Sequence, residues 1–180
     1  TEQIIYDTQL NTGADIGIAR IKGKGHYPRY EKTSSSEKTT TKLEAILEKW
    51  HEEQVKLNDI VILSAVSYSL SSAANLSRKW QDRIQILTKE NVLKQNPNKV
   101  LFSTIREYKG LDKPVVAVID IEKTMDGVLE NIDMINSKVE SFLYVAMTRS
   151  NRILWITVDE KFQKFLDEQQ PINYKKMTER

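Results

Sequence analysis

The chain has no cysteine, only two histidines (His26 and His51), and no apolar stretch long enough to span a bilayer. The absence of cysteine excludes disulfide scaffolds, thiolate zinc sites and cysteine nucleophiles. Two histidines argue against a metal site built from histidine. No signal peptide is visible either, so the sequence predicts a cytoplasmic protein with no membrane partner.

What remains is typical of one globular domain of ordinary size. The 180 residues are 39% hydrophobic and 29% charged, which favours a folded chain with a genuine core over a disordered one. A formal charge of +2 neither predicts nor excludes nucleic acid, because a local basic strip can hide in a neutral total. The sequence starts at Thr1 with no methionine, so we expect a fragment of a longer protein.

The first forty residues are the least regular part. Residues 13–30 hold four of the six glycines and one of the four prolines, as loops do. We expect 1–40 to be an irregular segment of loop and strand that packs onto a folded domain at 41–180. Ser34 and Glu37 have capping-box spacing and predict a helix start. Apolar residues then recur at helical spacing on one face: Leu43, Ile46, Leu47 and Trp50.

From there on, apolar runs alternate with helical patterns. Strands are expected within 59–66, 83–87, 96–105, 115–121 and 152–158, and helices within 71–81, 139–148 and 161–169. Residues 123–138 are loop-like and fit neither pattern. Such alternation predicts an α/β fold in which helices flank a mostly parallel sheet.

In sheets of this kind, ligands gather at the carboxyl ends of the strands. The segments that follow the expected strands are therefore the candidates for a site: 64–68, 106–112 and 120–123.

The loop "STIREYKGLDKP" carries the densest set of candidates. Gly110 permits a tight turn or a close approach to a ligand. Thr104, Arg106 and Lys109 supply a hydroxyl and two cations that suit a phosphate backbone, and Asp112 can accept a hydrogen bond from a ribose. Taken alone, the same loop is more typical of a charged connection with a glycine turn.

Arg149 ends the mostly apolar run "FLYVAMTR" and directly precedes an expected strand. A cation there complements the helix dipole, and capping is the commoner role. An arginine at the sheet edge also suits the γ-phosphate of a nucleotide held by another domain. The chain has no phosphate loop of its own, because Lys24 in "GKGHYP" is followed by Gly25 and by no helix signal.

Two stretches together resemble a known family. "STIREYKGLDKPVVAVID" is similar to motif V of the UvrD/Rep-like superfamily 1 DNA helicases, roughly T-x-H-x-x-K-G-L-E before a strand. "ESFLYVAMTRSNRILWI" is similar to their motif VI, roughly E-x-x-x-L-x-Y-V-A-x-T-R-A. The resemblance covers about residues 59–158. The family's histidine is Arg106 here and its glutamate is Asp112, and the large accessory insertion before Thr104 has no room.

The resemblance implies the C-terminal RecA-like domain, of P-loop NTPase type, of a motor with ATP between two such domains. Arg149 would be the catalytic arginine that reaches the γ-phosphate. The implied nucleotide-binding residues are Asp112, Gly110, Glu140, Tyr144 and Thr148. The implied DNA-binding residues are Thr104, Arg106 and Lys109.

The implied cofactors are ATP and Mg²⁺, bound mainly by an N-terminal RecA-like domain with a Walker loop. The implied partners are that domain and single-stranded DNA, with RNA not excluded, and the chain alone would hydrolyse essentially no ATP. An alternative is a degenerate helicase half that binds nucleic acid without catalysis. A third interpretation, a small-molecule enzyme using Asp120 or Glu122, finds no nucleophile–base pair in the sequence.

Overall fold

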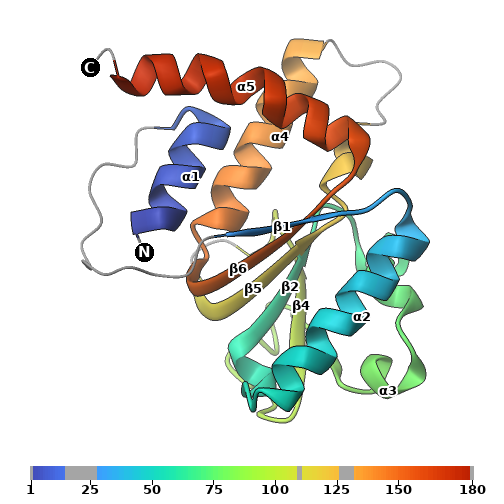
Figure 1. Cartoon of the computed structure of the whole chain (residues 1–180). Helices are drawn as coiled ribbons and strands as arrows, with labels where there is room; N and C mark the ends of the chain where they lie inside the picture. The colour runs from blue at the N-terminus through green and yellow to red at the C-terminus, as the bar shows by residue number, and fades with distance from the viewer. Residues whose placement is uncertain (1, 15–27, 109–110, 126–131, 179–180) are drawn as a thin grey trace.

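The computed structural model describes residues 2–14, 28–108, 111–125 and 132–178 (Figure 1). Its strands are β1 (Arg29–Lys32), β2 (Ile60–Ser64), β3 (Ile84–Ile86), β4 (Val100–Thr104), β5 (Lys113–Ile119) and β6 (Ser150–Val158). They form one sheet in the order β1-β6-β5-β2-β4-β3, and every neighbouring pair is parallel. The expected α/β fold with a parallel sheet is confirmed.

Helices cover both faces of the sheet and complete three layers (Figure 1). One face carries α1 (Glu2–Thr12), α4 (Ile132–Met147) and α5 (Glu160–Thr178). The other carries α2 (Ser36–Glu52), the 3₁₀ helix η3 (Ser72–Asn75) and α3 (Arg78–Gln81). Short 3₁₀ helices also occur at η1 (Leu57–Asp59), η2 (Tyr68–Leu70) and η4 (Ile121–Thr124). No described helix has the length and apolarity that a bilayer crossing requires.

The central strands are buried on both faces, and their side chains alternate between the two cores. Along β5, Val116 and Val118 contact the α4 and α5 layer, whereas Val115, Ala117 and Ile119 contact the α2 layer. This is the two-residue period of a strand between two helical layers. It explains why these strands read as continuous apolar runs in the sequence.

The N-terminal segment differs from the expected loop and strand. Residues 2–12 form α1, which packs on α4 and α5, and β1 extends the sheet beside β6. The buried face of α1 is largely polar, with Thr8, Asn11 and Thr12 beside Ile4. Asn11 donates to the hydroxyl of Tyr30 and accepts from Gln170. A helix that docks through hydrogen bonds leaves no apolar stripe in the sequence.

The start of α2 also moves by one residue from its expected position. Ser35 is the N-cap, and its hydroxyl accepts a hydrogen bond from the backbone N–H of Lys38 at 3.3 Å. The capping box expected from Ser34 and Glu37 is therefore wrong in its register. The amphipathic face holds, because Leu43, Ile46, Leu47 and Trp50 are all buried.

Three other expectations change in extent. The helix expected at 71–81 is split into η3 and α3, although Ala73, Leu76 and Trp80 are buried as its face required. Residues left unassigned at 123–138 include the first part of α4. The last helix continues through Pro171 to Thr178, past the end that a proline predicts.

Candidate functional site

The structure places the predicted site residues at opposite ends of the parallel strands. We call these the amino edge, where the strands begin, and the carboxyl edge, where they end. Asp112 and Arg149 directly precede β5 and β6, whose first residues Lys113 and Ser150 are paired in register. Thr104 is the last residue of β4. Because all strands are parallel, the first pair lies at the amino ends and Thr104 at the carboxyl ends. The expectation that 106–112 gather at the carboxyl ends is therefore wrong for Asp112.

Three groups hold the guanidinium of Arg149 at the amino edge. Nη1 donates to Oδ1 of Asp112 at 3.1 Å, Nη2 donates to the hydroxyl of Thr148 at 3.2 Å, and Nε donates to the carbonyl of Val145 at 3.3 Å. The Arg149 side chain is 23% exposed and that of Asp112 is 61% exposed. The arginine is thus fixed in direction while its tip stays open to solvent.

This geometry combines the two roles considered for Arg149. Its Nε satisfies a carbonyl in the last turn of α4, as a helix-end cation does. Its two terminal nitrogens donate to Asp112 and to Thr148. Each terminal nitrogen carries a second N–H besides the one that makes this bond, so the oriented guanidinium keeps donors that suit an incoming oxyanion.

Two of the predicted positioning residues, Glu140 and Tyr144, lie on α4, and Thr148 directly follows the helix at the same interval of four residues. Thr148 is anchored to the end of the helix, because its hydroxyl donates to the carbonyl of Tyr144 at 2.7 Å. That same hydroxyl accepts from Arg149, so Thr148 links the helix to the guanidinium. Tyr144 is exposed and Glu140 is half-buried. Of the three, Thr148 contacts Arg149 directly.

Tyr108 is a residue of this edge that the motif pattern did not single out. Its side chain is 1% exposed, and its hydroxyl has no hydrogen-bond partner among the described residues. Burial raises the pKa of this hydroxyl, the charge of Asp112 raises it further, and the charge of Arg149 opposes the rise. The sequence does not show that a hydroxyl will be buried without a hydrogen-bond partner. Only the folded structure identifies Tyr108 as such a residue.

The connection between β4 and β5 joins the two edges. Residues 105–112 run from the carboxyl end of β4 to the amino end of β5 with no helix among the described residues of this connection. Ile105 and Tyr108 are buried in the core of the α4 layer, and Leu111 packs against it. Of the predicted site residues, Thr104 and Arg106 therefore lie where this connection begins, and Asp112 lies where it ends. Lys109 and Gly110 fall outside the described residues.

At the carboxyl edge, Thr104 and Arg106 face different surroundings. The hydroxyl of Thr104 donates to Glu107 at 2.9 Å and accepts from the Glu107 backbone N–H at 3.2 Å. Arg106 is exposed and makes no hydrogen bond or ion pair within the described part of the chain. Arg106 is thus available for an anion, whereas Thr104 must first release Glu107 to donate.

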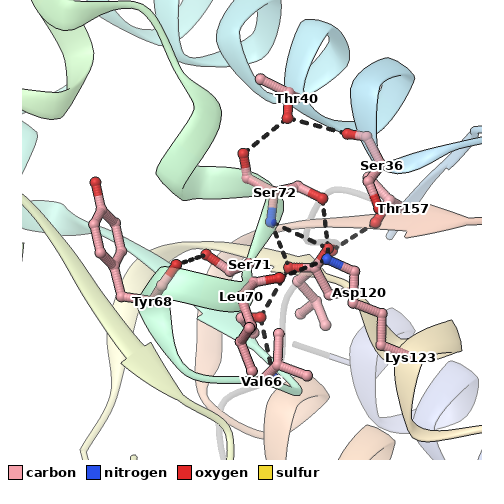
Figure 2. A network of polar contacts seen from close by, with 12 residues as sticks. Ser36, Thr40, Val66, Tyr68, Leu70, Ser71, Ser72, Asp120, Lys123 and Thr157 are labelled. Atoms are coloured by element: carbon pink, nitrogen blue, oxygen red, sulfur yellow. Dashed lines mark hydrogen bonds and ion pairs between the residues drawn. The ribbon is translucent and has the colours of Figure 1, made fainter.

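A buried aspartate organises the rest of this edge (Figure 2). Asp120 follows β5, is fully buried, and has a left-handed φ of 61°. Its carboxylate accepts from Ser64 at 2.9 Å, from the Ser72 hydroxyl at 2.5 Å and from the Ser72 backbone N–H at 3.0 Å. Lys123 lies 3.0 Å from the same carboxylate. This carboxylate, whose oxygens are all hydrogen-bonded, links β2, η3 and the end of β5, and we call the contacts of Asp120, Ser64 and Ser72 the latch.

Two of the candidate segments that follow strands, 64–68 and 120–123, are neighbours, because Ser64 contacts Asp120. Beside this latch, burial raises the pKa of Glu122 to about 7, and Asp120 and Asp159 add to the rise. One carboxylate oxygen of Glu122 is buried without a partner in the described structure. Among the described residues here, neither Asp120 nor Glu122 can act as a general base for an accessible serine, since Ser64 and Ser72 are buried within the latch.

The described residues form no cluster of ligands for a magnesium ion. Within residues 2–14, 28–108, 111–125 and 132–178, no three acidic or histidine side chains converge as metal ligands. The expectation that Mg²⁺ is held mainly by another domain is untouched by this finding, and no step below runs through the metal.

Comparisons with known proteins extend the argument about the fold. No family model and no curated protein matches the chain. A solved structure does match: the C-terminal domain of a possible DNA helicase from Lactobacillus plantarum WCFS1, at a TM-score of 0.64 and 15% identity. The alignment covers 94% of this chain and 91% of that one. The likeness shows that nearly the whole chain shares the fold of that domain.

Proposed function

We propose that the chain is the C-terminal RecA-like motor domain of an ATP-dependent superfamily 1 DNA helicase or translocase. Arg149 reaches the γ-phosphate of ATP held by an N-terminal domain with a Walker loop. The observation that carries the proposal is the Arg149 guanidinium, oriented by Asp112 and Thr148 yet open at the amino edge. The structural likeness to the C-terminal domain of a possible DNA helicase supports it.

The division of residues between two edges suggests how ATP and DNA are coupled. Nucleotide engages Arg149 and Asp112 at the amino edge, while Thr104 and Arg106 contact single-stranded DNA at the carboxyl edge. The crossover 105–112 connects the two, and its buried Ile105 and Tyr108 tie it to the core. Closure around ATP at Asp112 and movement of Thr104 on the DNA are coupled through this connection.

The test is Arg149→Ala in the full-length protein with its N-terminal domain present. ATP turnover stimulated by single-stranded DNA is expected to fall by about 10³-fold or more, as for other arginine fingers. Arg152→Ala, three residues away and exposed, is the matched control and leaves turnover unchanged. Turnover that survives Arg149→Ala, or robust ATPase activity of this chain alone, contradicts the proposal.

The second candidate is a nucleic-acid-binding module without catalysis. Arg106 favours it, because this exposed cation stands where the resembling family has a histidine and has no partner among the described residues. In that case Arg106→Glu weakens binding of single-stranded DNA, and Arg149→Ala changes nothing in the full-length protein. Loss of turnover in the Arg149 variant decides for the motor.

A further inference from the structure

A hollow on the α2 side of the sheet has no role in the proposed motor. It lies where the amino ends of β5 and β6 extend beyond α2, and its volume is about 620 Å³. A smaller hollow of about 220 Å³ continues it toward Lys42. The two share Arg29, Ile46, Lys49 and Trp155, so they form one groove between α2 and the β1–β6 side of the sheet.

The floor of this groove is apolar. Trp155 and Ile46 are buried beneath it, and the half-buried Val55, Pro114 and Ile153 line it from the α2 end and from β5 and β6. These side chains leave apolar surface open to solvent at the bottom of a concavity. An aliphatic or aromatic side chain of a ligand would bury that surface.

The rim of the groove is predominantly basic. Its cations are Arg29, Lys42, Lys49, Lys56 and Arg152, and its carboxylates are Glu31, Glu53 and Asp59. The five cations exceed the three carboxylates by two. Lys56 and Arg152 are exposed, and neither has a carboxylate within ion-pair distance in the described structure. They are the two rim charges left free to meet an anion.

We propose that this groove binds a short acidic segment of a partner protein. An apolar side chain of the segment packs on Ile153 and Val55, and flanking carboxylates pair with Lys56 and Arg152. A charged rim around an apolar centre is the common arrangement of peptide-binding surfaces. The proposal does not depend on the motor function, because none of these residues belongs to the Arg149 or Thr104 sites.

Nucleic acid fits this groove less well than an acidic peptide does. A phosphate backbone carries a charge on every residue and would meet Glu31, Glu53 and Asp59 together with the cations. It would also leave the apolar floor uncovered, since backbone contacts are made by cations and polar groups. An excess of two positive charges around an apolar hollow is complementary to a peptide segment that carries few carboxylates and one apolar side chain.

The probe for the experiment is a short labelled peptide of aspartates on both sides of one phenylalanine, followed by fluorescence anisotropy with this chain. Lys56→Glu/Arg152→Glu is expected to weaken binding by about tenfold or more, because two attractive pairs become repulsive. The matched control is Lys89→Glu/Lys94→Glu, an equal charge change at exposed lysines remote in sequence from the groove. Thermal unfolding of both variants confirms that they are folded.

Two further measurements separate the parts of the proposal. Replacing the phenylalanine of the probe by alanine is expected to weaken binding about tenfold, and Val55→Trp is expected to block the hollow. Equal loss in the two charge variants, or no dependence on the phenylalanine, overturns the proposal. Displacement of the probe by a single-stranded or duplex oligonucleotide, abolished by Lys56→Glu/Arg152→Glu, assigns the groove to nucleic acid and also overturns it.

Discussion

Arg149 and Asp112 are 37 residues apart in the sequence, and their side chains meet at 3.1 Å where β5 and β6 begin. The contact exists because the two strands are parallel neighbours, with Lys113 paired to Ser150 and the Lys113 N–H donating to the Arg149 carbonyl at 3.0 Å. Backbone pairing therefore fixes where both side chains start. Asp112 then supplies the carboxylate that orients one terminal nitrogen of the guanidinium.

Removal of the Asp112 carboxylate is expected to affect the orientation of Arg149 more than the stability of the domain. Asp112→Ala is expected to lower the free energy of unfolding by less than about 1 kcal/mol, because the Asp112 side chain is 61% exposed. In the full-length protein it is expected to lower kcat for ATP, because the guanidinium loses its orienting partner. Chemical denaturation and steady-state kinetics measure the two effects. Asp82→Ala, which removes an exposed pair with Arg78, is the control with unchanged kcat.

In contrast to Asp112, Asp120 is expected to contribute strongly to the free energy of unfolding. Asp120→Ala leaves Ser64, Ser72 and Lys123 without their buried acceptor, so the free energy of unfolding is expected to fall by about 3–5 kcal/mol. Asp120→Asn keeps an acceptor and tolerates the left-handed φ, so its loss is expected to be about 1–3 kcal/mol. Denaturation with urea distinguishes them. Equal losses in the two variants would mean that the negative charge of Asp120, which both variants lack, carries the effect rather than its acceptor atoms.

Glu122 gives the stability a pH dependence of defined sign. Its pKa is raised in the folded state to about 7, chiefly by burial, above its ordinary value of 4.5. The folded state thus holds a proton that the unfolded state releases, and stability falls as pH rises between those values. Glu122→Gln is expected to match the native chain near pH 4 and to exceed it at pH 8 by up to roughly 3 kcal/mol.

A second glutamate serves as the control of opposite sign. The hydrogen bond from Lys79 holds the pKa of Glu48 below its usual range, with the Trp80 indole also lowering it. Glu48 therefore contributes stability above its ordinary pKa and loses it as pH falls. Glu48→Gln is expected to be less stable than the native chain at neutral pH, with the difference shrinking in acid. If both variants shift stability in the same direction, the assignment for Glu122 is wrong.

The partly buried Tyr30 and the buried Tyr108 allow the cost of an unpartnered hydroxyl to be measured. The Tyr30 hydroxyl donates to Asp7 at 2.9 Å and accepts from Asn11 at 2.7 Å, whereas the Tyr108 hydroxyl has no partner among the described residues. Tyr30→Phe is expected to lower the free energy of unfolding by about 1–3 kcal/mol. Tyr108→Phe is expected to leave it unchanged or raise it by up to about 1 kcal/mol. A large loss for Tyr108→Phe would show that its hydroxyl is bonded in solution.

Much of the sheet was predictable because buried strands carry their signal locally. Five of the six strands coincide with apolar runs between turn residues, and the sixth, β1, lies at the edge with only four residues. The polar docking face of α1 gave no helical pattern, since Asn11 and Thr12 are buried through hydrogen bonds and tight packing. The last helix, which the sequence predicts within 161–169, continues through Pro171 to Thr178.

The sequence by itself determined the α/β class and the helix that leads to Arg149, because hydrophobic periodicity and strand propensity act over a few residues. Only the tertiary structure decided which edge of the sheet each candidate occupies. Asp112 follows a strand in the sequence, yet it lies at the amino edge, because the crossover from Thr104 spans the sheet before β5 begins. Parallel pairing, a long-range property, brings Asp112 to Arg149 and separates both from Thr104 and Arg106.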